Sequence, residues 1–113
     1  MNYTILDRGD LPFDGNTYEF VGSQHQNTDV SFIWVDMPPG GVVCLHTHPY
    51  KEIFIIQEGA ATYTVGTETL NAHAGQVIIV SADVPHKFMN SGDGQLRQID
   101  IHVNKEFITH WLE

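Results

Sequence analysis

Three side chains that commonly bind metal ions stand close together in the middle of the chain, namely His46, His48 and Glu52. Alternate residues of a β-strand point to the same side, so His46 and His48 can aim at one point. Pro49 breaks the strand after them, which lets a second strand return the Glu52 carboxylate to that point. The types and spacing of these residues therefore predict most of a metal site.

The size and charge of the chain limit the functions that it can have. The sequence has 113 residues, and we expect one domain over residues 1–113. The formal net charge is −9 with only five Lys and Arg residues, so neither nucleic acid nor an anionic membrane, which need a basic surface, is expected as a partner. The start of the chain lacks the features of a signal peptide, and no apolar run is long enough to span a membrane. We expect a cytoplasmic protein that binds a small molecule.

The single cysteine, Cys44, limits the metal chemistry. One cysteine forms neither an intramolecular disulfide nor a thiolate-rich zinc site, which leaves histidine and carboxylate as the ligands. Cys44 itself is expected to be a small buried apolar residue of a strand.

The elements that must position these residues are strands. Short runs rich in β-branched and aromatic residues alternate with turn residues, which is typical of an all-β sandwich or barrel. The expected strands cover residues 17–21, 30–37, 42–46, 52–57, 61–65, 68–71, 76–80, 86–90 and 96–103, with a candidate edge strand at 3–6. Helical spacing is found only in the tail, where residues 105–111 predict a short C-terminal helix that docks against the barrel.

The strand that begins at Glu52 is apolar on both faces. Phe54 and Ile56 share the side of Glu52, whereas Ile53 and Ile55 point the other way. Such a strand is usually buried on both faces, by a second sheet or a partner subunit. We therefore expect a homodimer.

The histidines belong to a longer pattern. The chain has Gly40, five residues, His46-Thr47-His48, three residues, Glu52, six residues and Gly59. This spacing reproduces the first conserved motif of the cupin superfamily, and the chain resembles its small single-domain members. The resemblance covers residues 34–103 or thereabouts, and it implies a double-stranded β-helix, or jelly-roll barrel.

The second cupin motif is present in altered form. Gly75, His86 and Asn90 stand in register with it, while Ser81 and Asp83 replace the proline and the turn glycine of the family. Aspartate is tolerated in turns where glycine is preferred, so the placement of His86 is expected to hold. The resemblance thus implies His86 as a fourth metal ligand.

The implied ligand set suits a transition metal. Three neutral imidazoles and one carboxylate favour Mn, Fe, Co, Ni, Cu or Zn over Mg and Ca. Four protein ligands on a six-coordinate ion leave two positions open for water, dioxygen or a bidentate substrate. The alternative is a set of hydrogen-bonded core residues in a cupin that has lost its metal.

Further polar residues are candidates for the same site. Gln98, Asp100 and His102 alternate along one strand, and they enter the barrel together if Ile99 and Ile101 pack outward; otherwise they face solvent. Inside the barrel, Asp100 or His102 could orient a ligand or act as a general base.

Trp34, Tyr50 and Phe88, together with Gln98, are candidate walls of a substrate pocket, with ordinary packing as the alternative for each. The remaining histidines, His25, His73 and His110, fall in expected loops or the tail and are expected to be solvated.

Three classes of function remain. The first is a small metal-dependent enzyme, with oxygenase-type chemistry on an enol, a catechol or a similar small molecule. The second is a binding or sensing module without turnover. The third, a sugar isomerase or epimerase, is weakened because the five basic residues are scattered rather than clustered for binding phosphate. We predict the enzyme.

Overall fold

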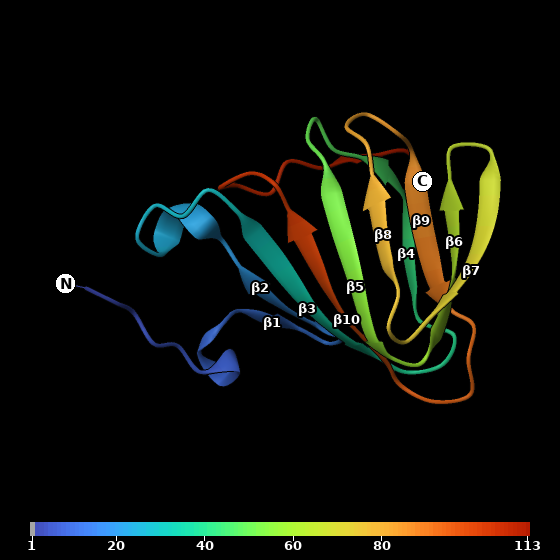
Figure 1. Cartoon of the computed structure of the whole chain (residues 1–113), viewed down its shortest axis with the longest axis horizontal. Helices are drawn as coiled ribbons and strands as arrows, with labels where there is room; N and C mark the ends of the chain where they lie inside the picture. The colour runs from blue at the N-terminus through green and yellow to red at the C-terminus, as the bar shows by residue number, and fades with distance from the viewer. Residues whose placement is uncertain (1) are drawn as a thin grey trace.

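The computed structural model describes residues 2–113, and its regular structure is almost entirely β (Figure 1). The strands are β1 (Phe13–Asp14), β2 (Thr17–Phe20), β3 (Ser31–Met37), β4 (Val42–Thr47), β5 (Glu52–Glu58), β6 (Ala60–Val65), β7 (Glu68–His73), β8 (Val77–Val80), β9 (His86–Asn90), β10 (Leu96–His102) and β11 (His110–Trp111). In this part of the chain the helical segments are single 3-10 turns, η1 (Arg8–Asp10) and η2 (Gly22–Gln24), so no helix could span a membrane.

Two antiparallel sheets lie face to face. The six-stranded sheet has the order β1-β2-β3-β10-β5-β8, and the five-stranded sheet has the order β11-β4-β9-β6-β7. Apolar side chains from both sheets, such as Phe54, Ile56, Tyr63 and Leu96, fill the space between them. The predicted all-β jelly-roll barrel is confirmed.

Several turns contain residues in the left-handed region, and two of these residues are motif positions, Gly59 and Asp83. Gly59 joins β5 to β6 with a φ of +90°, and a Cβ there would lie 2.5 Å from the carbonyl oxygen of Gln95. Asp83 has a φ of +66° in the turn before His86, so it adopts the conformation for which glycine is preferred. Its N–H donates to the His48 carbonyl at 2.8 Å, and this bond fixes the turn beside the histidines.

The prediction of a C-terminal helix is wrong. The tail forms bends and the short strand β11, which pairs with β4. The Leu112 N–H donates to the Leu45 carbonyl at 2.9 Å, so the backbone of the tail forms hydrogen bonds with the edge strand of a sheet. Phe107 and Trp111 follow helical spacing because both line a cavity inside the barrel.

The edge strand predicted at residues 3–6 is also absent, since no strand is assigned in residues 2–12. Cys44, expected to be buried, is exposed.

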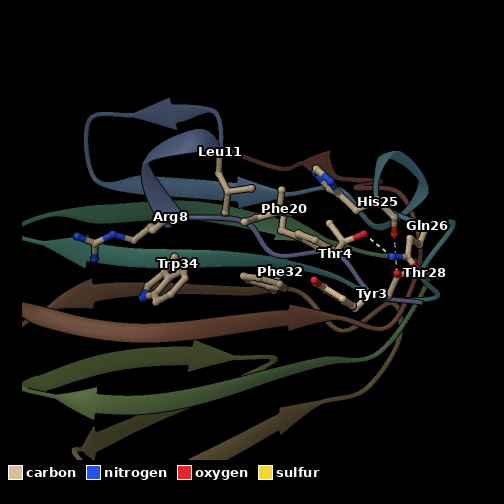
Figure 2. Close-up of a pocket in the computed structure, with 11 residues that line it drawn as sticks. Tyr3, Thr4, Arg8, Leu11, Phe20, His25, Gln26, Thr28, Phe32 and Trp34 are labelled. Atoms are coloured by element: carbon tan, nitrogen blue, oxygen red, sulfur yellow. Dashed lines mark hydrogen bonds between the residues drawn. The ribbon is translucent and has the colours of Figure 1, made fainter. Parts of the chain in front are cut away.

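The outer face of the six-stranded sheet carries apolar side chains across five strands. Cross-strand partners form two rows, Val77–Ile55–Ile99–Trp34–Tyr18 and Ile79–Ile53–Ile101–Phe32–Phe20. The segment around η1 lies over the β2–β3 end, where it encloses a pocket of about 410 Å³ with Phe20, Phe32 and Trp34 (Figure 2). The β5–β8 end is left open, with Ile79 62% and Val77 58% exposed.

Candidate metal centre

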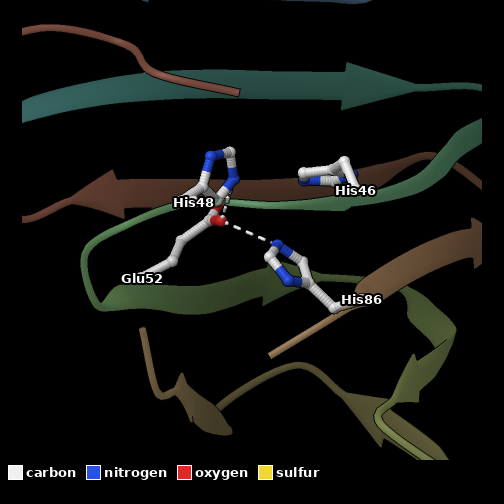
Figure 3. Close-up of side chains that lie close together, drawn as sticks. All are labelled: His46, His48, Glu52 and His86. Atoms are coloured by element: carbon white, nitrogen blue, oxygen red, sulfur yellow. Dashed lines mark hydrogen bonds and ion pairs between the residues drawn. The ribbon is translucent and has the colours of Figure 1, made fainter. Parts of the chain in front are cut away.

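Both sheets contribute to a cluster of four buried side chains (Figure 3). His46 lies near the end of β4, and it pairs across the ladder with His86 at the start of β9. His48 follows β4, and Glu52 begins β5 in the opposite sheet. The candidate ligand atoms all lie within 4.8 Å of one another. The fold therefore brings together the four residues that the two motifs predict as ligands.

Main-chain carbonyls orient three imidazoles in the same way. The Nδ1 atoms of His46, His48 and His86 lie 2.6, 2.8 and 2.9 Å from the carbonyl oxygens of Cys44, Ile108 and Val84, respectively. A carbonyl only accepts hydrogen bonds, so each Nδ1 carries the proton. In the neutral imidazoles the Nε2 lone pairs are then free to bind a cation.

The Glu52 carboxylate faces these lone pairs. Its Oε1 lies 3.0 Å from the Nε2 atoms of both His48 and His86. Lone pairs at that distance from a carboxylate oxygen repel it unless a cation lies between them. A proton on His86 relieves one contact only, and the buried Nε2 of His48 still has no aligned hydrogen-bond partner. A divalent metal ion satisfies all of these atoms at once, so the residues present fit a metal.

The pKa shifts agree with this donor set. Burial is the main reason why the pKa of His46 falls to about 4, so this ring is neutral near pH 7. For Glu52, burial opposes the charged form, but contacts with His102, His48 and His86 outweigh it and hold its pKa well below the usual range. Burial also opposes charge on His86, yet its contact with Glu52 prevails and raises the pKa of His86. A proton therefore competes with a metal ion at His86.

His102 holds the other oxygen of Glu52. Its Nε2 lies 3.2 Å from Glu52 Oε2, and its Nδ1 lies 2.6 Å from the Tyr50 hydroxyl. That hydroxyl accepts the Ile108 N–H at 3.1 Å, so its single proton is free to go to His102 Nδ1. His102 then carries its own proton on Nε2, which lies close to Glu52 Oε2 but, like the Nε2 of His48, is not aligned for a hydrogen bond.

A second buried chain of polar groups lies beside the cluster. The Tyr63 hydroxyl donates to Gln98 Oε1 at 2.5 Å, and Gln98 Nε2 donates to Asp100 Oδ1 at 2.7 Å. Burial, followed by the negative charge of Glu52, raises the pKa of Asp100 well above its usual value. Gln98, Asp100 and His102 are thus all inside the barrel, and Ile99 and Ile101 face outward.

A cavity of about 260 Å³ opens next to the cluster. An engineered cavity of about 150 Å³ in another protein holds benzene, so this one has room for about a single ring with substituents. Its walls are Asp14, Thr17, Glu19, Ile33, Val35, Val43, His46, His48, Glu52, Phe54, Phe88, Asp100, His102, Phe107, Thr109 and Trp111.

The predicted pocket residues lie in different places. Phe88 lines the cavity. Tyr50 stacks on His48 with ring centroids 5.1 Å apart, and Gln98 lies behind Asp100. Trp34 is on the outer face of β3, in the pocket under η1, because its neighbours Ile33 and Val35 take the inner face. His25, His73 and His110 are outside the four-residue cluster. His73 and His110 are exposed, as expected, although they lie in β7 and β11, whereas His25 is half-buried and stacks on Phe20 in the pocket under η1.

Sequence reasoning missed Thr17 and Glu19 of β2, which line the cavity. Their signal is the alternation Thr17-Tyr18-Glu19-Phe20. This alternation did not predict the cavity wall, because the two aromatic residues face outward and the two polar residues face inward, the reverse of the usual arrangement.

Known proteins resemble this chain in sequence and in structure. A polyketide synthase, CurC, from Streptomyces cyaneus is 34% identical over 64 residues, which is 56% of this chain and 42% of that protein. An oxalate decarboxylase from Lactobacillus farciminis in complex with formate has a TM-score of 0.81 at 23% identity, covering 92% of this chain and 34% of that one. An oxalate oxidase in complex with glycolate has a TM-score of 0.74 at 18% identity, covering 85% and 54%.

The structural similarities establish the fold, and this chain spans less than two thirds of the length of each of these relatives. The family model of the cupin domain matches residues 33–102. The resemblance predicted from the two motifs is thus confirmed, and the chain belongs to the cupin domain family.

Proposed function

We propose that His46, His48, Glu52 and His86 hold one divalent transition-metal ion and that the protein is a small metal-dependent enzyme. The observation that carries the proposal is the set of four buried ligand atoms within 4.8 Å of one another, with the Nε2 atoms of His48 and His86 facing Glu52 Oε1, beside a cavity with room for a small molecule. A structure of Bacillus subtilis oxalate decarboxylase that is described with Mn(II) centres has a TM-score of 0.79 at 24% identity and covers 88% of this chain and 29% of that one. Manganese is therefore the first ion to test, among Mn, Fe, Co, Ni, Cu and Zn.

The proposed chemistry is of the oxygenase type, on an enol, a catechol or a similar molecule. A bound metal ion would supply open coordination positions and Lewis acidity. His102 orients Glu52, and Asp100 presents a carboxyl group to the cavity that can give or take a proton from the ligand. Phe54, Phe88 and Phe107 make part of the cavity wall apolar. The name of the polyketide synthase relative is consistent with a substrate that carries enol or phenol oxygens.

Oxygen uptake tests this proposal. The metal-loaded protein is expected to consume dioxygen with at least one member of a panel of enols, catechols, thiols and 1,3-diketones, and the His86→Ala variant is expected to consume none above background. If no member of the panel causes oxygen consumption and a small molecule is recovered bound to the protein, the non-catalytic binding module is favoured instead. The sugar isomerase is disfavoured, since the described cavity walls carry no Lys or Arg to bind phosphate.

We also propose that the protein is a homodimer through the open β5–β8 end of the outer face. A contiguous exposed apolar face of this kind is typical of subunit interfaces. Light scattering is expected to give twice the mass of the 113-residue chain, and Ile79→Glu, which places a charge on the exposed apolar face of edge strand β8, is expected to halve that mass. Thr69→Glu on exposed β7 is the control; a monomeric wild type would contradict the proposal. A cytoplasmic location remains a prediction.

A further inference from the structure

The walls of the metal cavity are acidic. Asp14, Glu19, Glu52 and Asp100 line it, and none of the lining residues in the described chain is Lys or Arg. If a divalent ion is bound, it cancels the charge of Glu52 and leaves one positive charge. The half-buried carboxylate of Glu19 offsets that remaining charge, and the exposed carboxylate of Asp14 adds a second negative charge. The formal charge of the cavity is therefore negative even with the ion in place.

The basic side chains of the protein are held elsewhere. Arg97 forms ion pairs with Glu58 and Asp36. Lys105 lies 3.6 Å from Asp29, and Lys87 lies 3.6 Å from Glu113.

The two remaining basic residues also lie outside the cavity. The guanidinium of Arg8 lies over the rings of Tyr18 and Trp34 on the outer face, 4.8 and 5.5 Å from their centroids. Lys51 is exposed and is not among the residues that line the cavity. No described Lys or Arg is therefore available to neutralise a carboxylate ligand in the cavity.

Glu19 is fixed on the cavity side by the register of the sheet. Glu19 of β2 lies opposite Ile33 of β3, and Ile33 lies opposite Asp100 of β10. Residues directly opposite one another in a ladder point to the same face. Glu19 is half-buried, so solvent screens its charge less than that of an exposed residue.

Apolar side chains line other parts of the cavity, with Ile33, Val35 and Phe54 from one sheet and Val43 and Phe88 from the other. Apolar walls favour a compact ring or branched carbon body. The carboxyl groups among them accept hydrogen bonds from hydroxyl or ammonium groups, and they repel a carboxylate.

We propose that this cavity selects a neutral or cationic ligand with hydroxyl or amino groups on a compact apolar body, and that it rejects carboxylate ligands. This inference rests on the proposed function, because the ligand is placed beside the metal centre. It separates the chain from the oxalate decarboxylases and oxalate oxidase that it resembles in fold, whose names specify a dicarboxylate.

Three ring diols of different charge test the inference. Catechol is neutral, 3,4-dihydroxybenzoate carries a carboxylate, and 3,4-dihydroxybenzylamine carries an ammonium group on a substituent of similar size. Each is titrated by calorimetry into the Mn-loaded protein without oxygen, at pH 7. The benzoate is expected to bind at least about tenfold more weakly than the benzylamine, which is the size of effect that one half-screened carboxylate gives.

The Glu19→Gln variant tests whether the Glu19 charge causes the difference in affinity. It is expected to narrow the gap between the benzoate and the benzylamine to about threefold or less, since it removes the half-buried charge. Glu68→Gln, which removes the same charge from exposed β7, is the matched control and is expected to keep the gap. Benzoate binding as tight as benzylamine binding, or a gap unchanged in Glu19→Gln, would overturn the inference and leave the proposed function standing. Failure of all three diols to bind would overturn both.

Discussion

Replacing His86 with alanine is expected to remove the metal from the protein. Wild type is expected to hold about one equivalent of a divalent transition metal per chain, because four buried ligand atoms lie within 4.8 Å of one another. Loss of an outer-shell partner typically costs about 10–100-fold in metal affinity, so loss of a ligand should exceed about 100-fold. Elemental analysis after dialysis, and competition against a chelator of known affinity, measure the effect.

Two further variants make this result specific. His73→Ala removes an exposed histidine outside the cluster, and it is expected to keep a full metal load. Glu52→Gln is expected to weaken binding more than His86→Ala, because Glu52 is the only anionic ligand and contacts three imidazoles. An equal metal load in His86→Ala and wild type would contradict the assignment, and so would full affinity in Glu52→Gln. Thermal unfolding of each metal-free protein shows whether it is folded.

The ligands could be predicted from sequence because their geometry is local. His46 and His48 are two apart beside one strand, and Glu52 follows after a single turn. The alternation of Gln98, Asp100 and His102 also limits them to one face of a strand. The alternation does not say which face of the strand points into the barrel. The burial of Gln98, Asp100 and His102 shows that the polar face does.

The same ambiguity explains why the positions of Trp34 and Glu19 were not predicted. An aromatic side chain in a strand is usually placed in the core and a glutamate in solvent. In β2 and β3 the assignment is reversed, because the outer face is covered by the η1 segment and the inner face lines a polar cavity. The pairing of β3 with β2 and with β10, the latter between segments some 65 residues apart, fixes the direction of Trp34. Such long-range register is not encoded in a local pattern.

The prediction of a helix in the tail is wrong for a related reason. Its apolar residues are spaced as in a helix, but they serve a cavity built by other elements, with Phe107 beside His102 and Trp111 beside His46. The edge of β4 offers unpaired backbone groups to the tail, and pairing there replaces intrahelical hydrogen bonds. Tertiary context thus overrides a short helical pattern.

The second large effect is expected at Gly59, where Gly59→Ala should destabilise the fold by about 3 kcal/mol or more. A left-handed φ costs a residue with a Cβ about 1–2 kcal/mol, and overpacking adds about 1–3 kcal/mol. Gly59 has a φ of +90°, and its Cβ would lie 2.5 Å from the Gln95 carbonyl oxygen, which is backbone and cannot rotate away. Urea unfolding of the metal-free protein measures the loss as a lower midpoint with an unchanged slope.

Gly75 supplies a matched control, because its φ is also +90° but nothing lies within 4 Å of its Cβ position. Gly75→Ala is expected to cost about 1–2 kcal/mol, the backbone term alone. Equal losses in the two variants would show that the close approach to Gln95 contributes nothing. Gly59 and Glu52 lie at opposite ends of β5, about 20 Å apart in an extended strand. A folded Gly59→Ala protein is therefore expected to keep the metal affinity of wild type, because the glycine that closes the first motif serves the turn, whereas the histidines and the glutamate serve the metal.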